Sequence, residues 1–397
     1  MSRHALRREL DRAAPDDPAA RERSWRVVQA AYAGYEPRPR RRPWAALLAM
    51  ALVALAGAAG VAAASAPRSD VGRFVRGVLG VGRPDARTAL VRVPGGGRLL
   101  VASGSSTWIV SDDGARRRLG TYDGASWSPR GRYAVVWRGA ELTAVDPRGR
   151  VRWSLAPRAQ PISHARWAPG DGFRVAYLAG PSLRIVDGDG TGDRRFAAAR
   201  ADVAPAWRPG ATHVLAYVDR RDRVNVVATD SGDRAWRGGA VARGAQLLWS
   251  AAGDRLLVLT PRRLALFDGR GRLVAARGIG AGLIAEHAVW SPHGRQVAVV
   301  RMSRATHHSE VVVLDARRGL RERLLPAGPG RFGAPAWSPD GRWLLLPWPE
   351  ADQWLFLRPT GARRVTAVAN IARQFAPGAG RPSFPRTVTW CCPAAAP

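Results

Sequence analysis

Short runs of apolar residues recur along most of the chain, each flanked by turn-forming residues. Clear examples lie at 133–136, 175–178, 214–217, 256–259 and 297–300. Because these runs lack polar alternation, they predict strands that are covered on both faces. A half-buried strand ending in an Asp- and Gly-rich turn follows, as at 183–188, and then an Arg-rich strand, as at 116–119. A charged outer strand is typical of a sheet edge that avoids pairing with other chains.

A Trp and a turn precede each apolar run. In the clearest copy, residues 337–341 read WSPDG, and the Ser, Pro and Gly suit the first, second and fourth positions of a type I turn. Successive Trp residues are 40, 40, 42, 41 and 47 positions apart. They are Trp127, Trp167, Trp207, Trp249, Trp290 and Trp337. A repeat of about 40 residues built from short strands is the signature of a β-propeller, so we interpret these Trp residues as structural positions.

The number of repeats depends on the two ends of the array. A degenerate unit covers residues 93–119, and its Trp position falls at Arg92. Residues 387–390 resemble a single Trp strand with no unit after it. We therefore expect one terminus to supply the strand that closes the ring. The sequence predicts an all-β propeller of seven blades over residues 88–390, with six blades as the alternative, followed by a short C-terminal tail at 391–397.

A different apolar pattern precedes the repeats. Residues 44–66 form an uncharged stretch of 23 residues, long enough as a helix to cross the ~30 Å core of a bilayer. The Arg-rich segment 38–42 lies just before it, so the positive-inside rule predicts a cytoplasmic N-terminus and an extracytoplasmic propeller at the cell membrane. A cleaved signal peptide is the alternative, because small residues at 62–66 fit a cleavage site. We favour an uncleaved anchor, since about 43 residues precede this long run.

The segments on either side of the predicted span have weak helical patterns. Residues 1–43 contain 11 Arg against 6 acids, and a helix there would place Trp25, Val28 and Tyr32 along one stripe. The segment is either a marginal helix or a helix that uses this stripe to dock a cytoplasmic protein. Residues 67–87 predict a juxtamembrane amphipathic segment, which either lies on the membrane surface or packs under the propeller.

The repeat resembles a known type of propeller. The pattern W-S-P-D-G-R, followed by an apolar strand and a V-x-D-x-x-G turn, resembles the TolB-type repeat over about residues 88–365. Such propellers occur in periplasmic translocation proteins, in prolyl oligopeptidase-like peptidases and in many membrane-tethered bacterial proteins. The order of a basic tail, one span and a propeller resembles uncharacterised actinobacterial single-pass membrane proteins. The resemblance implies a propeller displayed outside the membrane.

The charge of the chain indicates the kind of partner. The 397 residues include 62 basic side chains, all of them Arg, against 31 acidic ones, a net charge of +31. A surface of this kind attracts polyanions, so an anionic envelope ligand or a protein is expected on the propeller. Nucleic acid is not expected, because the sequence contains no zinc-finger spacing, helix-turn-helix pattern or aromatic-interleaved basic helix.

Two segments carry possible metal ligands, and neither is a complete site. Asp187, Asp189 and Asp193 resemble a calcium loop, but the Glu that closes an EF-hand loop is absent. His307, His308 and Glu310 lie in the longest interval between Trp residues, where an insertion is the best place for a specialised loop. Neighbouring strand residues point to opposite faces, so one zinc ion rarely binds both imidazoles. We predict no metal and no cofactor.

Cys391 and Cys392 are the only cysteines, so the fold has no disulfide framework. In an oxidising compartment they could link two chains, or they could fill small sites in a closing strand.

The sequence favours binding over catalysis. The G-x-S-x-G elbow of the propeller-gated peptidases is absent, and no segment outside the repeats is long enough for their catalytic domain. We predict a non-catalytic binding or scaffolding module. One alternative is a transmembrane regulator, similar in topology to anti-sigma proteins, with the propeller as its sensor. Another is a hydrolase or lyase in the central channel, which would need a ring of carboxylates or His near the axis.

Overall fold

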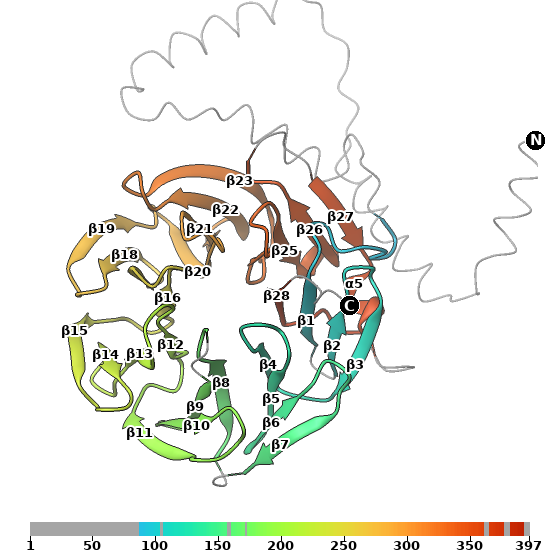
Figure 1. The fold of residues 1–397 in the computed structure, drawn as a ribbon. Helices are drawn as coiled ribbons and strands as arrows, with labels where there is room; N and C mark the ends of the chain where they lie inside the picture. Colours follow the sequence, from blue (N-terminus) through green and yellow to red (C-terminus); the bar gives the residue numbers. More distant parts are fainter. Residues whose placement is uncertain are drawn as a thin grey trace, which may run out of the picture. The chain divides into compact units, whose positions relative to one another are not determined.

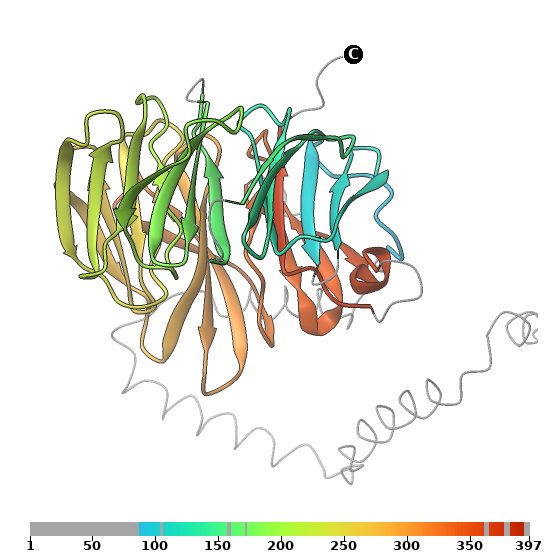
Figure 2. The same ribbon diagram turned by 90° about the horizontal axis from the view of Figure 1, so that it is seen from below.

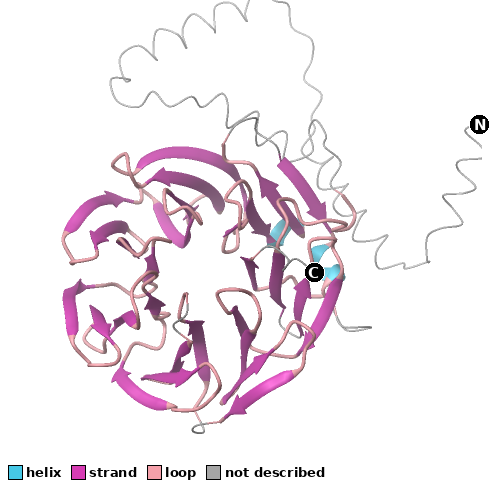
Figure 3. Ribbon diagram, in the orientation of Figure 1, coloured by secondary structure: helices cyan, strands magenta, loops and turns pink. Residues whose placement is uncertain are grey.

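The part of the chain that the structure describes folds into seven four-stranded antiparallel sheets arranged in a ring (Figure 1). This computed structural model describes residues 87–103, 106–156, 160–170, 173–360, 365–376 and 382–392. Figure 3 shows that strands make up nearly all of the regular structure there. The all-β class and the count of seven blades are therefore confirmed, and the six-blade alternative is wrong.

The blades are numbered here in chain order. Blade 1 contains β1 (Arg98–Ser103), β2 (Ser106–Val110), β3 (Arg116–Gly120) and β28 (Thr387–Cys391). Blade 2 contains β4 (Gly124–Trp127), β5 (Ala134–Arg138), β6 (Glu141–Val145) and β7 (Val151–Leu155). Blade 3 contains β8 (Ile162–Trp167), β9 (Arg174–Ala179), β10 (Ser182–Asp187) and β11 (Arg194–Ala198). Blade 4 contains β12 (Ala206–Trp207), β13 (Val214–Val218), β14 (Arg223–Ala228) and β15 (Arg234–Ala240).

The remaining three blades follow the same order from the centre outward. Blade 5 contains β16 (Gln246–Trp249), β17 (Arg255–Leu259), β18 (Arg263–Asp268) and β19 (Leu273–Gly278). Blade 6 contains β20 (Leu283–Trp290), β21 (Gln296–Ser303), β22 (His308–Asp315) and β23 (Arg321–Pro329). Blade 7 contains β24 (Ala336–Trp337), β25 (Leu344–Trp348), β26 (Gln353–Leu357) and β27 (Val365–Ala369), with the short helices η1 (Pro349–Ala351) and α5 (Ile371–Gln374).

The two ends of the repeat array meet in blade 1. The C-terminal strand β28 pairs antiparallel with β1 and takes the innermost place, so the prediction that one terminus closes the ring is confirmed. The prediction that the first unit has its Trp position at Arg92 is wrong. Trp390 lies opposite Leu99, just as Trp249 lies opposite Leu256 in blade 5. The missing inner strand comes from the other end of the chain, whereas Arg92 lies outside every strand.

The Trp residues join neighbouring blades. All six predicted repeat Trp residues end an innermost strand, and all but Trp127 are buried. Three indole N–H groups donate to a backbone carbonyl of the preceding blade, at 2.9 to 3.4 Å: Trp207 to Arg166, Trp290 to Leu248 and Trp337 to Val289. Each acceptor directly precedes the Trp of its own blade, so these three contacts are equivalent, whereas the indole nitrogens of Trp127, Trp167 and Trp249 have no partner in the described structure.

In four blades, a Ser directly after the Trp stabilises the turn through hydrogen bonds. The Ser338 hydroxyl accepts the backbone N–H of Trp343 at 2.9 Å, and Gly341 donates to the Ser338 carbonyl at 2.9 Å. Gly341 has a φ of 67°, a conformation that glycine adopts without steric cost. Ser128, Ser250 and Ser291 accept the corresponding N–H in their own turns.

The core lies within and between the blades. The second strand of each blade is buried on both faces, as β25 and β17 illustrate, in agreement with the sequence pattern. At the seam, Ile371 of α5 and Phe375, which directly follows this helix, lie in one apolar cluster with residues of blades 7 and 1. Arg87, which precedes the ring, forms a parallel bridge with Val368 of β27.

The predicted cytoplasmic tail, the span at 44–66 and nearly all of the juxtamembrane segment lie outside the described residues. Among the residues that are described, no helix has the length and apolar character needed to cross a membrane.

Candidate functional site

Blade 6 is longer than its neighbours. Its strands have 8, 8, 8 and 9 residues, whereas the second and third strands of the other blades have five or six. Figure 2 shows these strands extending below the rest of the ring. The long interval before Trp337 therefore lengthens two hairpins and does not form a separate loop. The turn at 304–308 lies at the tip of the extension and is exposed.

The possible zinc ligands lie on this extension, and they do not converge. His307 is in the turn, with a φ of 51°, and its carbonyl accepts the N–H of Gly330 at 2.7 Å. The Nδ1 of His308 is 2.8 Å from the carbonyl of Thr306. Glu310 is instead paired with Arg301 at 2.6 Å. Within the described part of the chain, no three His, Cys, Asp or Glu residues are grouped so that they could hold a metal.

A buried arginine stabilises the extension. Arg301 is only 8% exposed, and its guanidinium contacts Glu310 at 2.6 Å and Glu322 at 2.7 Å. It also donates to the carbonyl of Ile279 at 3.1 Å. Arg277 adds a second cation to Glu322 at 2.7 Å. Charge-assisted hydrogen bonds of this kind fix the geometry of three strands at once.

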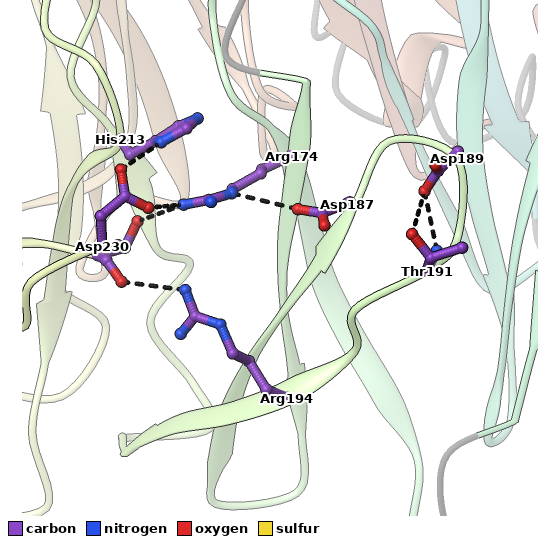
Figure 4. A network of polar contacts seen from close by, with 8 residues as sticks. Arg174, Asp187, Asp189, Thr191, Arg194, His213 and Asp230 are labelled. Carbon is purple, nitrogen blue, oxygen red and sulfur yellow. Dashed lines mark hydrogen bonds and ion pairs between the residues drawn. The ribbon is translucent and has the colours of Figure 1, made fainter.

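The three carboxylates of the possible calcium loop contact different partners. Asp187 accepts from Arg174 at 3.2 Å, and Asp189 accepts from the backbone and hydroxyl of Thr191 (Figure 4). Asp193 accepts from Tyr177 at 2.6 Å and from Arg184 at 2.5 Å. Burial, and then the hydrogen bond with Asp193, raise the pKa of Tyr177. The segment is therefore a strand-connecting turn whose carboxylates already have partners.

A polar cluster joins blades 3 and 4 at this turn (Figure 4). Arg174 links Asp187 of its own blade to Asp230 of the next blade. His213 contacts the second oxygen of Asp230 at 2.7 Å, and Arg194 donates to the carbonyl of Thr229 at 3.0 Å. Hydrogen bonds from His213 and then from Arg174 lower the pKa of Asp230. Because every polar group here has a protein partner, we assign the cluster to blade packing.

The innermost strands carry little that could perform catalysis. Of the described residues in these strands, the ionisable ones are His164, Arg166, Glu286 and His287. Burial lowers the pKa of both His164 and His287, so both imidazoles are neutral at neutral pH. The one carboxylate, Glu286, is paired with Arg331. The ring of acids or His that a channel hydrolase would need is absent from the described inner strands.

The two cysteines are joined to each other in the closing strand. The Cys391–Cys392 bond is 2.08 Å long. The Sγ of Cys392 lies 3.3 Å from the carbonyl of Pro129, in the turn of blade 2. The disulfide therefore lies where the last strand meets the second blade. Sequence reasoning considered bonds between chains and small packing sites for these thiols and missed this arrangement, although their adjacency was a possible signal.

Comparisons with known proteins bear on the fold alone. No family model matches the chain, and no curated protein matches its sequence. A protein of unknown function from Desulfotomaculum acetoxidans DSM 771 is similar in structure, with a TM-score of 0.56 and 12% identity, over 75% of this chain and 100% of that one. A chain of the mitotic checkpoint complex has a TM-score of 0.55 and 15% identity, over 70% of this chain and 95% of that one. These similarities concern the fold, and the protein is a seven-bladed β-propeller.

Proposed function

We propose that this chain is a non-catalytic binding or scaffolding propeller, anchored to the cell membrane by residues 44–66 with the propeller outside. The propeller fold supports a role in protein binding, because blade-connecting turns on a rigid ring are common contact surfaces. The charge of +31 and the uncharged 23-residue stretch support the anchor and an acidic partner.

The enlarged blade 6 is the observation that carries this proposal. Its tip at 304–308 is exposed, and the buried Arg301 network holds the supporting strands in place. A preorganised hairpin loses little conformational entropy on binding. More of the free energy of its contacts with a partner therefore contributes to affinity. The tip carries Arg304 and no acidic residue, which favours an acidic protein surface or an anionic envelope polymer as its partner.

Site-specific photocrosslinking tests this role. A crosslinking amino acid placed at Thr306 is expected to capture discrete partners on intact cells. The same group at Ser231, an exposed turn residue of blade 4, is the matched control. Equal capture from both positions would show that blade 6 has no special role.

Protease treatment of intact cells tests the anchor. With a different tag at each end, we expect the C-terminal tag on a released propeller and the N-terminal tag in a protected membrane fragment. A propeller that is already free of its N-terminal tag in untreated cells would show that residues 44–66 are a cleaved signal peptide.

A further inference from the structure

A cavity of about 230 Å³ lies between blades 4 and 5. Strands β14 and β15 form one side of it, and β17, β18 and β19 form the other. Its apolar lining includes Trp236, Phe267 and Val258, while Leu273 and Arg263 are exposed at its opening. Leu273 is 53% exposed. Among the described residues, no carboxylate lines this cavity.

A glycine bulge in β15 creates the space. The pairing of β14 with β15 shifts from Arg223–Ala240 to Asn225–Arg237, which leaves Gly238 and Gly239 opposite Val224. Neither glycine has a side chain to fill the gap between the blades. Bulges of this type are frequent beside binding sites, where they redirect a strand.

The equivalent contact between blades 2 and 3 differs in its indole hydrogen bond. Trp153 of β7 lies against the turn at Gly190, and its indole N–H donates to the carbonyl of Gly188 at 2.7 Å. Trp236 lies against the corresponding turn at Gly271 and packs on Phe267, with ring centroids 5.6 Å apart. Its indole nitrogen, however, is buried without a hydrogen-bond partner in the described structure.

The carbonyl that would accept this hydrogen bond contacts another residue. Arg208 lies 3.5 Å from the carbonyl of Gly269, the counterpart of Gly188. The outer strands of blades 1, 2, 3, 5 and 6 also shift register, and other indoles also lack a partner, so the cavity itself and its charge carry the argument.

The volume of the cavity indicates what kind of group can occupy it. An apolar cavity of about 150 Å³ accommodates benzene, whereas sites for drug-sized ligands occupy about 300–1,000 Å³. A cavity of about 230 Å³ therefore fits one aromatic side chain better than a cofactor. The outer edge of β15 has no strand partner among the described residues. An extended peptide segment that carries the aromatic side chain can therefore lie along this edge.

The positive charge around the opening indicates which residues would flank the aromatic side chain in a partner. Arg263 has no ion pair within the described chain, and neither the adjacent Arg262 nor Arg234, which begins β15, has one. We propose that the cavity binds an acidic segment of a partner protein, which inserts one aromatic side chain between blades 4 and 5. This site shares no residue with the blade 6 tip, so each proposal can fail without the other.

The test is the affinity of the full chain for a labelled heptapeptide with a central Phe flanked by Glu and Asp, measured by fluorescence anisotropy. Ala265 lines the cavity, so Ala265→Phe is expected to fill it and abolish binding. Arg263→Glu should weaken binding about fivefold or more, and the matched Arg262→Glu about twofold or less, because only Arg263 lines the opening.

Three outcomes would overturn the proposal. Equal binding of a peptide with Ala in place of Phe would show charge attraction alone. Equal effects of the two Arg variants would place the peptide elsewhere on the surface. Phenylacetate binding as tightly as the peptide would indicate a small-molecule site. If Ala265→Phe fails to fold, as judged by its melting temperature, the pair of Arg variants still decides the matter.

Discussion

Trp390 lies opposite Leu99, so a residue near the C-terminus completes the first blade of the ring. This pairing joins the two ends of the repeat array. The contact is also non-local, because nearly the whole repeat array separates β1 from β28 in the sequence.

A charge placed in the closing strand should open the ring. Val388 is 4% exposed and lies opposite Val101, so Val388→Asp would bury a carboxylate without a partner. We expect the free energy of unfolding in urea to fall by roughly 3 kcal/mol or more. The neighbouring Thr389 is exposed, and Thr389→Asp should change it by less than about 0.5 kcal/mol. Similar losses in the two variants would contradict this position of β28.

Removing Arg301 should destabilise blade 6. Arg301→Ala leaves Glu310 and Glu322 without their central cation. Breaking a fully buried pair costs about 3–5 kcal/mol, but these carboxylates are 22% and 19% exposed, so we expect about 2–3 kcal/mol. Arg304→Ala, at the exposed tip, is the control and should be nearly neutral. Hydrogen exchange should increase in β21 and β22 first, and unchanged exchange there would refute the role given to Arg301.

The turn of blade 5 should titrate at unusually low pH. A hydrogen bond from the Arg272 side chain, together with backbone N–H donors, lowers the pKa of Asp268 from 3.8 to about 2. Because the pKa is lower in the folded state, this carboxylate favours folding above pH 3.8, and its contribution is lost as the pH falls to about 2.

Arg272→Ala tests this assignment by an NMR titration of the Asp268 carboxyl group. We expect its pKa to move up toward 3.8 in this variant. Arg270→Ala is the control, because only the backbone N–H of Arg270 contacts Asp268 and that bond is retained. An equal rise in both variants would mean that the Arg272 side chain is not the main cause.

The two cysteines should form a disulfide within one chain and not between chains. Because Cys391 and Cys392 are bonded to each other, alkylation of the denatured protein should modify neither thiol before reduction and both afterwards. Mass spectrometry counts the added groups, and a non-reducing gel should show a single chain. A disulfide-linked dimer would restore the alternative in which these cysteines join two chains.

Sequence periodicity was sufficient to predict the blades. The Trp spacing, the Ser-Pro-x-Gly turns and the doubly covered strands are local features, because every blade except blade 1 is built from about 40 consecutive residues. The Asp- and Gly-rich turn around Asp189 is local in the same sense, because Asp189 accepts the backbone N–H of Thr191, two residues away.

Contacts between distant residues could not be predicted in this way. Trp390 takes the position assigned to Arg92 because ring closure pairs strands from the two ends of the chain, and no local pattern encodes that pairing. The binding partners of Arg301 and the cavity beside Trp236 likewise depend on strand register and a glycine bulge.

The sequence by itself determined the repeating unit, its number of strands and the basic character of the surface, since these follow from composition and from spacing along the chain. Only the tertiary structure decided which strand closes the ring, which carboxylates already have cationic partners and where space remains between blades. These depend on how side chains from separate repeats meet, and packing between repeats has no signature in the order of residues within one repeat.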